Sequence, residues 1–233
     1  MYKRQDHTVY TVDLLGCGRS DKSSITYTNF VYVQMISDFI KKIIGQKTDV
    51  IASGFSGSFV TMACHNEKEL FNKIMLVNPP SLTQLKQMPN RKDRLLKAAL
   101  EIPIFGTLVY HMIVSRDNIN NLFIEKMYYN PFHVDNQMAD AYYEAAHKGG
   151  YYTRFLYSSL AAKYININIC HALKALDNSI YIVEGETEPN GKAVTDDYCA
   201  SNPAIEVSVL KETKHLPHVE APEAFLEQVK IFF

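Results

Sequence analysis

The stretch DVIASGFSGSFV, residues 49–60, joins a short apolar run to a segment rich in small residues. Its first five residues are typical of a short buried strand, and residues 59–65 predict the opening of a helix. Gly54 and Ser58 stand two positions before and after Ser56, and a sharp turn from strand to helix needs small residues at both places. The pattern predicts that Ser56, at the centre of the turn, has strained backbone angles and presents its hydroxyl group as a nucleophile.

Neighbouring serines fit this turn less well. With Ser53 at the centre, Ile51 and Phe55 would occupy the two crowded positions, and with Ser58 at the centre Val60 would occupy one of them. These side chains are too large for a turn of this kind. A glycine-rich turn that only connects a strand to a helix is the ordinary alternative, because the five-residue motif alone is a weak signal.

Strand and helix patterns alternate on both sides of the turn. Runs rich in β-branched and apolar residues predict five strands, at 8–13, 49–53, 74–78, 180–184 and 205–210. Helical spacing of apolar residues, with glycine or proline at the ends, predicts helices at 29–45, 59–65 and 222–233. The alternation predicts an α/β fold with a mostly parallel sheet and flanking helices.

The pattern changes between residues 82 and 176, where helical segments rich in Tyr, Met, Leu and Ala follow one another. We interpret this stretch as a helical cap inserted into a core that consists of residues 1–81 and 177–233. Its tyrosines are expected to form the core of the cap, and a cleft beneath the cap can share them. They include Tyr128, Tyr129, Tyr142 and Tyr143.

Composition excludes several classes of partner. The chain has 24 basic and 25 acidic residues and a formal net charge of −1, so it lacks the electrostatic footprint of a protein that binds nucleic acid or an anionic membrane. No apolar run reaches the length of a membrane span. The four cysteines form neither a zinc-ligand spacing nor a disulfide framework. We expect a cytoplasmic protein with a small-molecule partner, and with no cofactor and no metal.

Four segments resemble the α/β-hydrolase family. DLLGCGRSDK at 13–22 resembles the loop after that family's fourth strand, and LVNP at 76–79 resembles the end of its sixth strand. GETEP at 185–189 resembles the turn that carries the catalytic acid, and HLPHVEAPE at 215–223 resembles the loop that carries the catalytic histidine. With the turn around Ser56, the resemblance covers nearly the whole chain outside 82–176.

The resemblance implies a role for each residue of a triad. Ser56 attacks an acyl carbon, His215 takes its proton and later delivers it to the leaving group, and Glu188 orients the imidazole. Gly57 supplies a backbone N–H of the oxyanion hole. The chain order of nucleophile, acid and histidine also agrees. The chain departs from the family at Ser58, where glycine is usual, and at Glu188, where aspartate is more usual.

Other residues compete for these roles. His218 is a second candidate base, Asp196 and Asp197 are alternative acids, and Asn78 orients a histidine only weakly because it carries no charge. A metal site at His215, His218 and Glu220 is disfavoured, because a short loop without a further ligand cluster lacks a preformed geometry.

The beginning of the chain predicts a fragment. MYKRQ at 1–5 resembles the translation of a transposon end used to prepare sequencing libraries, and the expected strand at 8–13 resembles the family's fourth strand. The resemblance implies that three strands and a second oxyanion donor lie upstream of residue 1. We therefore expect poor stability and impaired activity of the chain as given.

Two functions are consistent with the sequence. The first is a carboxylesterase-like serine hydrolase that acts on an ester or related acyl substrate through a Ser-His-Glu triad. The alternative is a non-catalytic α/β-hydrolase-like protein that binds a small molecule or serves as a scaffold. The fold also supports C–C bond hydrolysis and perhydrolysis, whereas dehalogenation is disfavoured because Ser56 is not a carboxylate nucleophile.

Overall fold

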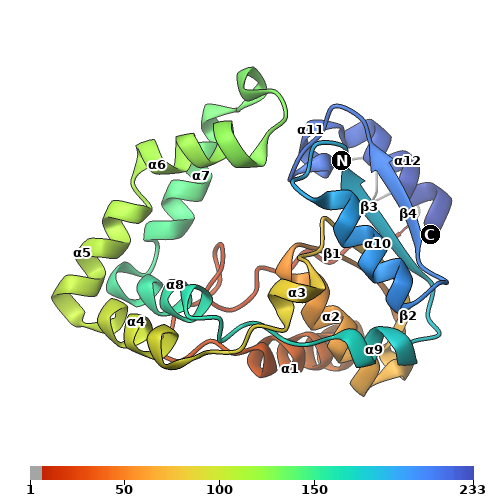
Figure 1. Ribbon diagram of the computed structural model, residues 1–233, viewed down its shortest axis with the longest axis horizontal. Coiled ribbons are helices and arrows are strands. Elements are labelled where there is room, and N and C mark those ends of the chain that lie inside the picture. Colours follow the sequence, from red (N-terminus) through yellow and green to blue (C-terminus); the bar gives the residue numbers. More distant parts are fainter. Residues whose placement is uncertain (1–6) are drawn as a thin grey trace.

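A four-stranded parallel sheet forms the centre of the protein in a computed structural model that describes residues 7–233. The resemblance of residues 1–5 to a transposon end lies outside the described residues. The strands are β1 (Thr48–Ser53), β2 (Phe71–Val77), β3 (Ile180–Gly185) and β4 (Glu206–Leu210). They pair in the order β1-β2-β3-β4 with all pairs parallel, so their carboxyl ends meet at one edge (Figure 1).

Alternate side chains of β2 enter two different cores, as the period of a strand requires. Ile74 and Leu76 pack on one face of the sheet, in a core that helices α1 (Asn29–Phe39), α2 (Phe55–Asn66), α9 (Cys170–Ala175) and α10 (Gly191–Ser201) share. Met75 and Val77 pack on the other face, against α12 (Pro222–Phe232). Both faces are covered, which confirms the predicted fold class.

The structure contains the predicted helices, but some of them begin or end differently from the prediction. The first continues from α1 into a π-helical turn, η2 (Ile40–Ile44), and ends at Gly45, whose φ of 72° is the left-handed conformation that a glycine adopts most easily. Helix α2 begins at Phe55, four residues earlier than the sequence predicts. Helix α12 begins with proline at its first position, as predicted.

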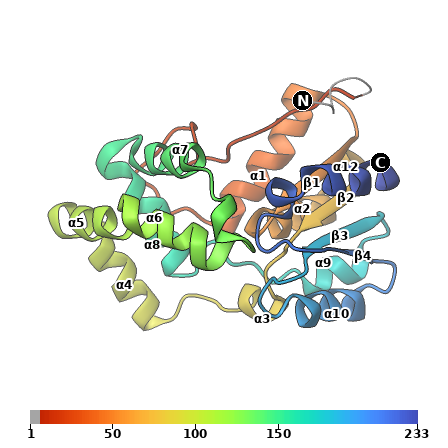
Figure 2. The same cartoon turned by 90° about the horizontal axis from the view of Figure 1, so that it is seen from above.

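Every described element between β2 and β3 is helical. Helix α4 begins with a reciprocal capping box between Asn90 and Asp93, and α5 begins with a proline in its first turn. The elements are α3 (Leu82–Leu85), α4 (Arg91–Glu101), α5 (Pro103–Ile113), α6 (Arg116–Leu122), η4 (Phe123–Met127), η5 (Pro131–His133), α7 (Asn136–His147), η6 (Gly150–Thr153), α8 (Arg154–Ala161) and α9. We call residues 82–176 the helical insertion; its helices α4 to α7 arch away from the sheet (Figures 1 and 2).

The helical insertion has a core of its own. Ile119, Phe123, Tyr128 and Ala139 form a buried cluster, and Leu216 from the loop after β4 is part of it. The insertion is therefore packed against the segment that follows the last strand. Among residues 7–233 no single helix has the length and apolar composition of a membrane span; α4 and α5 meet both criteria only when joined across a 96° bend.

The prediction of a strand at 8–13 is wrong. The segment has no strand conformation, and Val9, Tyr10 and Val12 are between 42% and 47% exposed. A β-branched pattern gives a strand only where a neighbouring strand offers backbone partners. In the described part of the chain residues 8–13 pair with no strand and β1 pairs only with β2, so the sheet has four strands instead of five.

Candidate active site

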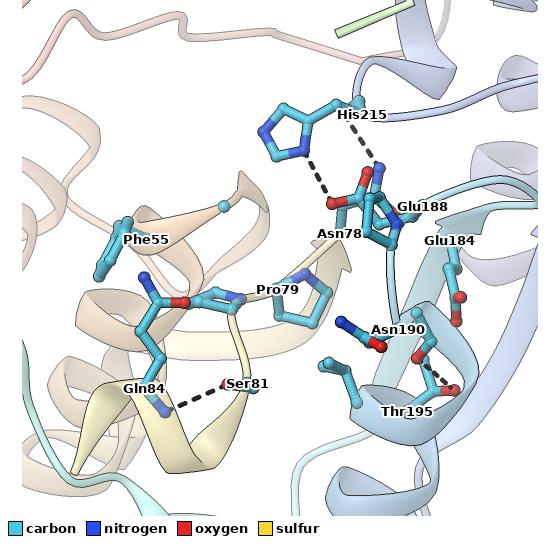
Figure 3. Close-up of a pocket in the computed structure, with 15 residues that line it drawn as sticks. Phe55, Asn78, Pro79, Ser81, Gln84, Glu184, Glu188, Asn190, Thr195 and His215 are labelled. Atoms are coloured by element: carbon cyan, nitrogen blue, oxygen red, sulfur yellow. Dashed lines mark hydrogen bonds and ion pairs between the residues drawn. The ribbon is translucent and has the colours of Figure 1, made fainter. Parts of the chain in front are cut away.

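A cavity of about 390 Å³ lies at the carboxyl edge of the sheet (Figure 3). Residues that follow three strands line it, with Gly54 and Phe55 directly after β1, Asn78 directly after β2 and Glu188 in the loop after β3. His215, from the loop after β4, completes this part of the lining. All four strand ends thus contribute to one cavity, which is where ligands bind in open α/β sheets.

Glu188 and His215 are in direct contact in this cavity. The Oε1 atom of Glu188 lies 3.1 Å from Nδ1 of His215, and the side chains are 20% and 34% exposed (Figure 3). A carboxylate at Nδ1 favours the tautomer that carries its proton there and leaves Nε2 free to accept a proton. The second oxygen of Glu188 is buried and has no hydrogen-bond partner among the described residues.

Asn78 holds the backbone of the histidine loop. Its Nδ2 donates to the carbonyl oxygens of Lys214, at 2.8 Å, and His215, at 3.0 Å. Its Oδ1 accepts a hydrogen bond from the N–H of Gly185 at 3.0 Å. The sequence predicts Asn78 only as a weak partner of the imidazole; in the structure it joins β2, β3 and the loop after β4 through main-chain groups. Its polar side chain at a strand end was the available signal.

Ser56, the second residue of α2, is not among the residues that line the cavity, although Gly54 and Phe55 directly before it are. It is partly buried, and its Oγ donates to the carbonyl oxygen of Ser53 at 2.6 Å. Within residues 7–233 no hydrogen bond joins Ser56 to His215. The structure therefore brings the predicted acid and base into contact, while the hydroxyl of the predicted nucleophile bonds to its own turn.

The strained residue of the turn is Gly54 and not Ser56. Gly54 has φ 57° and ψ −132°, whereas Ser56 is not among the described residues with positive φ. The sequence predicts the strain at the serine itself. A glycine adopts this conformation at the lowest cost because it has no Cβ. The chain therefore turns immediately after β1, and the N–H of Gly54 still pairs with Val77 of β2 at 2.9 Å.

The other turn residues are tightly held. The N–H of Gly57, the predicted oxyanion donor, donates to the carbonyl of Gly54 at 3.1 Å. Ser58 is fully buried, and its Oγ donates to the carbonyl of Phe55 at 2.7 Å. The hydroxymethyl group of Ser58 is thus accommodated inside the turn.

The alternative site residues lie elsewhere. Asp196 pairs with Lys192 on the exposed side of α10, and Asp197 is also exposed. The ring of His218, in α11 (Pro217–Glu220), lies 5.8 Å from the ring of Phe225. None of these three side chains lines the cavity. No group of three or more His, Cys, Asp or Glu residues in the described ranges is placed to hold a metal ion.

Glu184 is a site residue that sequence analysis missed. It is 5% exposed, lines the cavity, and has one carboxyl oxygen without a hydrogen-bond partner in the described part of the molecule (Figure 3). Burial raises the pKa of Glu184, and the nearby charge of Glu188 adds to the increase, while a hydrogen bond from Thr195 opposes it. Its position near the end of a predicted strand, at the edge where the strand ends meet, was the feature of the sequence that could have indicated a site residue.

A parallel sheet with helices on both faces and a cavity at its carboxyl edge is typical of an α/β protein that binds a ligand at its strand ends. In this chain the cavity contains a Glu–His pair. The chain belongs to the alpha/beta hydrolase family, whose family model matches residues 2–228. A search of curated proteins finds no match.

Solved structures with the same fold are similar over most of the chain. A carboxylesterase from the thaumarchaeon Nitrososphaera gargenis is 15% identical, with a TM-score of 0.66, over 94% of this chain and 77% of that one. A bromoperoxidase from Bacillus anthracis is 11% identical, with a TM-score of 0.72, over 94% and 79%. A 2-hydroxy-6-oxo-6-phenylhexa-2,4-dienoate hydrolase from Rhodococcus sp. strain RHA1 is 16% identical, with a TM-score of 0.71, over 95% and 78%. At these identities the likeness concerns the fold.

Proposed function

We propose that this chain is a carboxylesterase-like serine hydrolase that acts on an ester or related acyl substrate through Ser56, His215 and Glu188. The contact between Glu188 and His215 at 3.1 Å carries the proposal. It lies in a cavity that Gly54 and Phe55, the residues directly before Ser56, also line. An acid, a base and a serine-bearing turn at one sheet edge are the parts that acyl transfer needs.

The proposed reaction requires a rotation of the Ser56 side chain. Its hydroxyl leaves the carbonyl of Ser53, transfers its proton to Nε2 of His215, and Oγ bonds to the acyl carbon of the substrate. The imidazolium, stabilised by Glu188, then returns this proton to the departing alcohol. Water hydrolyses the acyl-serine by the same route, which frees the acid and restores the Ser56 hydroxyl.

Covalent labelling with a fluorophosphonate tests the proposal. Wild-type protein is expected to incorporate one probe, and Ser56→Ala is expected to abolish incorporation because the nucleophilic oxygen is gone. Ser53→Ala is the matched control, since it removes a neighbouring exposed hydroxyl and leaves the Ser53 carbonyl in place. Labelling that persists in Ser56→Ala would refute Ser56 as the nucleophile.

A second candidate function is binding of a small molecule without turnover. The hydrogen bonds from Ser56 to Ser53 and from Gly57 to Gly54 favour it, because they engage the two groups that acyl transfer needs free. A ligand that raises the melting temperature of a protein that no fluorophosphonate labels would support this function.

A further inference from the structure

The loop that carries His215 is attached to the helical insertion as well as to the sheet. The N–H of His215 donates to the carbonyl of Met127 at 3.1 Å, and Nζ of Lys214 donates to the carbonyl of Glu125 at 2.6 Å. Leu216, only 8% exposed, is buried in the core of the insertion. The insertion therefore contacts the histidine's own main chain.

One carboxylate joins the two sides of this contact. Oε1 of Glu220 accepts a hydrogen bond from the N–H of Tyr129 in the insertion at 2.6 Å. Oε2 of Glu220 accepts one from the N–H of Lys214, directly before the histidine, at 2.8 Å. Both are charge-assisted bonds to backbone groups, which are about twice as strong as neutral ones.

The main chain of Lys214 and His215 is thus held by hydrogen bonds from two sides. Asn78 of the core binds the carbonyls of Lys214 and His215, while Met127 and Glu220 bind their N–H groups. A backbone whose donors and acceptors are both occupied has little freedom to rotate. The direction of the imidazole, and hence its contact with Glu188, follows from this arrangement.

We propose that Glu220 is a positioning residue that makes the orientation of His215 depend on the seating of residues 123–129 of the insertion. The proposal rests on the hydrolase function proposed above, to which it adds a control of the base by the insertion. A displacement of about 1 Å in a catalytic group can lower a rate by about 100-fold. Loss of the Glu220 bridge releases the loop on its insertion side and misaligns the imidazole.

The chemistry of the bridge predicts which substitutions it tolerates. Both partners of Glu220 are N–H donors, so the bridge needs two acceptor oxygens. Glu220→Gln keeps the size of the side chain but turns an amide NH₂ toward one of these donors. Glu220→Asp keeps both acceptors on a shorter side chain. Glu223→Gln, on the exposed first turn of α12, is the matched control for loss of one negative charge.

Steady-state kinetics with p-nitrophenyl acetate test the proposal in the full chain. We expect Glu220→Gln to lower kcat by about 10- to 100-fold with KM changed less than about twofold, because the cavity lining is intact. Glu220→Asp should lower log kcat by no more than half as much as Glu220→Gln does. Glu223→Gln should have the kcat and KM of wild type. Equal kcat in Glu220→Gln and Glu223→Gln, or a change in KM alone, would overturn the proposal.

A measurement without catalysis separates this proposal from the proposed function. The ring ¹⁵N resonances of His215, assigned by their loss in His215→Gln, should shift or broaden in Glu220→Gln and stay unchanged in Glu223→Gln. If wild-type protein is not labelled by a fluorophosphonate, the hydrolase function fails, and these resonances still decide the role of Glu220. If Glu220→Gln does not fold, Tyr129→Pro, which removes the N–H that donates to Oε1 of Glu220 and leaves Glu220 itself in place, replaces it, and unchanged resonances in that variant would overturn the proposal.

Discussion

Asn78 shows how one uncharged side chain satisfies three main-chain groups at the site. It combines two N–H donors and one oxygen acceptor, and it tolerates its positive φ of 43° better than most residues do. Aspartate has the same shape but no donor, and it would face two carbonyl oxygens with a negative charge.

Asn78→Asp is expected to lower the free energy of unfolding by about 1–3 kcal/mol, because two partly buried carbonyls lose their donors. Urea denaturation measures the effect. Asn121→Asp, at an exposed position of α6, is the control for the added charge. Equal stability of the two variants would contradict the described role of Asn78.

Gly54 and Gly45 both have a positive φ but differ in ψ, so the cost of an ordinary residue can be compared at the two positions. A Cβ would meet no atom within 4 Å at either Gly54 or Gly45, so substitution by alanine tests the backbone alone. Gly45, with φ 72° and ψ 9°, is close to the left-handed helical region, whereas Gly54, with φ 57° and ψ −132°, lies outside the three main regions that other residues adopt.

We therefore expect Gly54→Ala to cost more stability than Gly45→Ala, about 1–3 kcal/mol against about 1–2 kcal/mol. Thermal or urea denaturation of the two variants provides the measurement. A larger loss in Gly45→Ala would show that the turn after β1 adapts to an ordinary residue.

At the level of the elements, β3 and α10 meet at a buried carboxyl group. Glu184, the penultimate residue of β3, lies against the first turn of α10, where a Cβ on Gly191 would lie 1.7 Å from its Oε1. Because burial raises its pKa, folded protein binds a proton at Glu184 more tightly than unfolded protein does. The ionised form of Glu184 therefore destabilises the fold.

The sign of this linkage gives a pH prediction. Between the ordinary glutamate pKa and the raised pKa of Glu184, the folded state holds more protons, so stability falls as pH rises. Glu184→Gln should remove this pH-dependent fall in stability. The free energy of unfolding of the variant should exceed that of wild type by an amount that grows upward from about pH 4 and then levels off. Urea denaturation at a series of pH values measures it; a pH-independent difference would contradict the raised pKa.

The elements also show how far sequence analysis reaches. Four of the five predicted strands exist. The apolar patterns of β2 and β3 match buried positions, whereas β1 and β4 are edge strands whose residues are mostly half-buried or exposed. The family resemblance predicted Glu188 and His215 as partners, and the structure places them in contact. The strand at 8–13 was wrong because strand formation depends on a partner that local pattern does not contain. The bonds of Ser56 and the bridge at Glu220 depend on backbone groups that side-chain patterns do not describe. The catalytic roles stay predictions until the variants are measured.

For the whole molecule, the charge of the cavity bears on the substrate. Two carboxylates, Glu184 and Glu188, line it, and the other charged or titratable side chain in the lining is His215. No lysine or arginine is among these lining residues, all of which are in the described part of the chain. A negative group on a bound acyl chain would therefore meet like charge without a basic partner.

Esters of equal length test this. We expect mono-p-nitrophenyl succinate to be hydrolysed with a kcat/KM about tenfold or more below that of p-nitrophenyl butyrate, since a like charge nearby costs about 1 kcal/mol or more. Glu184→Gln should reduce the difference in kcat/KM between the two esters, because it removes one of the two carboxyl groups in the lining. A preference for the succinate ester would contradict the electrostatic argument.

The assembly of one cavity from all four strand ends has a kinetic consequence. Asn78 and the N–H of Gly185 that it binds are 107 residues apart in the chain, and such distant pairs form slowly during folding because a long loop must close first. Compact intermediates with helices and the β1-β2 pair in place would still lack a working centre. Recovery of probe labelling after dilution from denaturant should consequently lag behind recovery of helical circular dichroism.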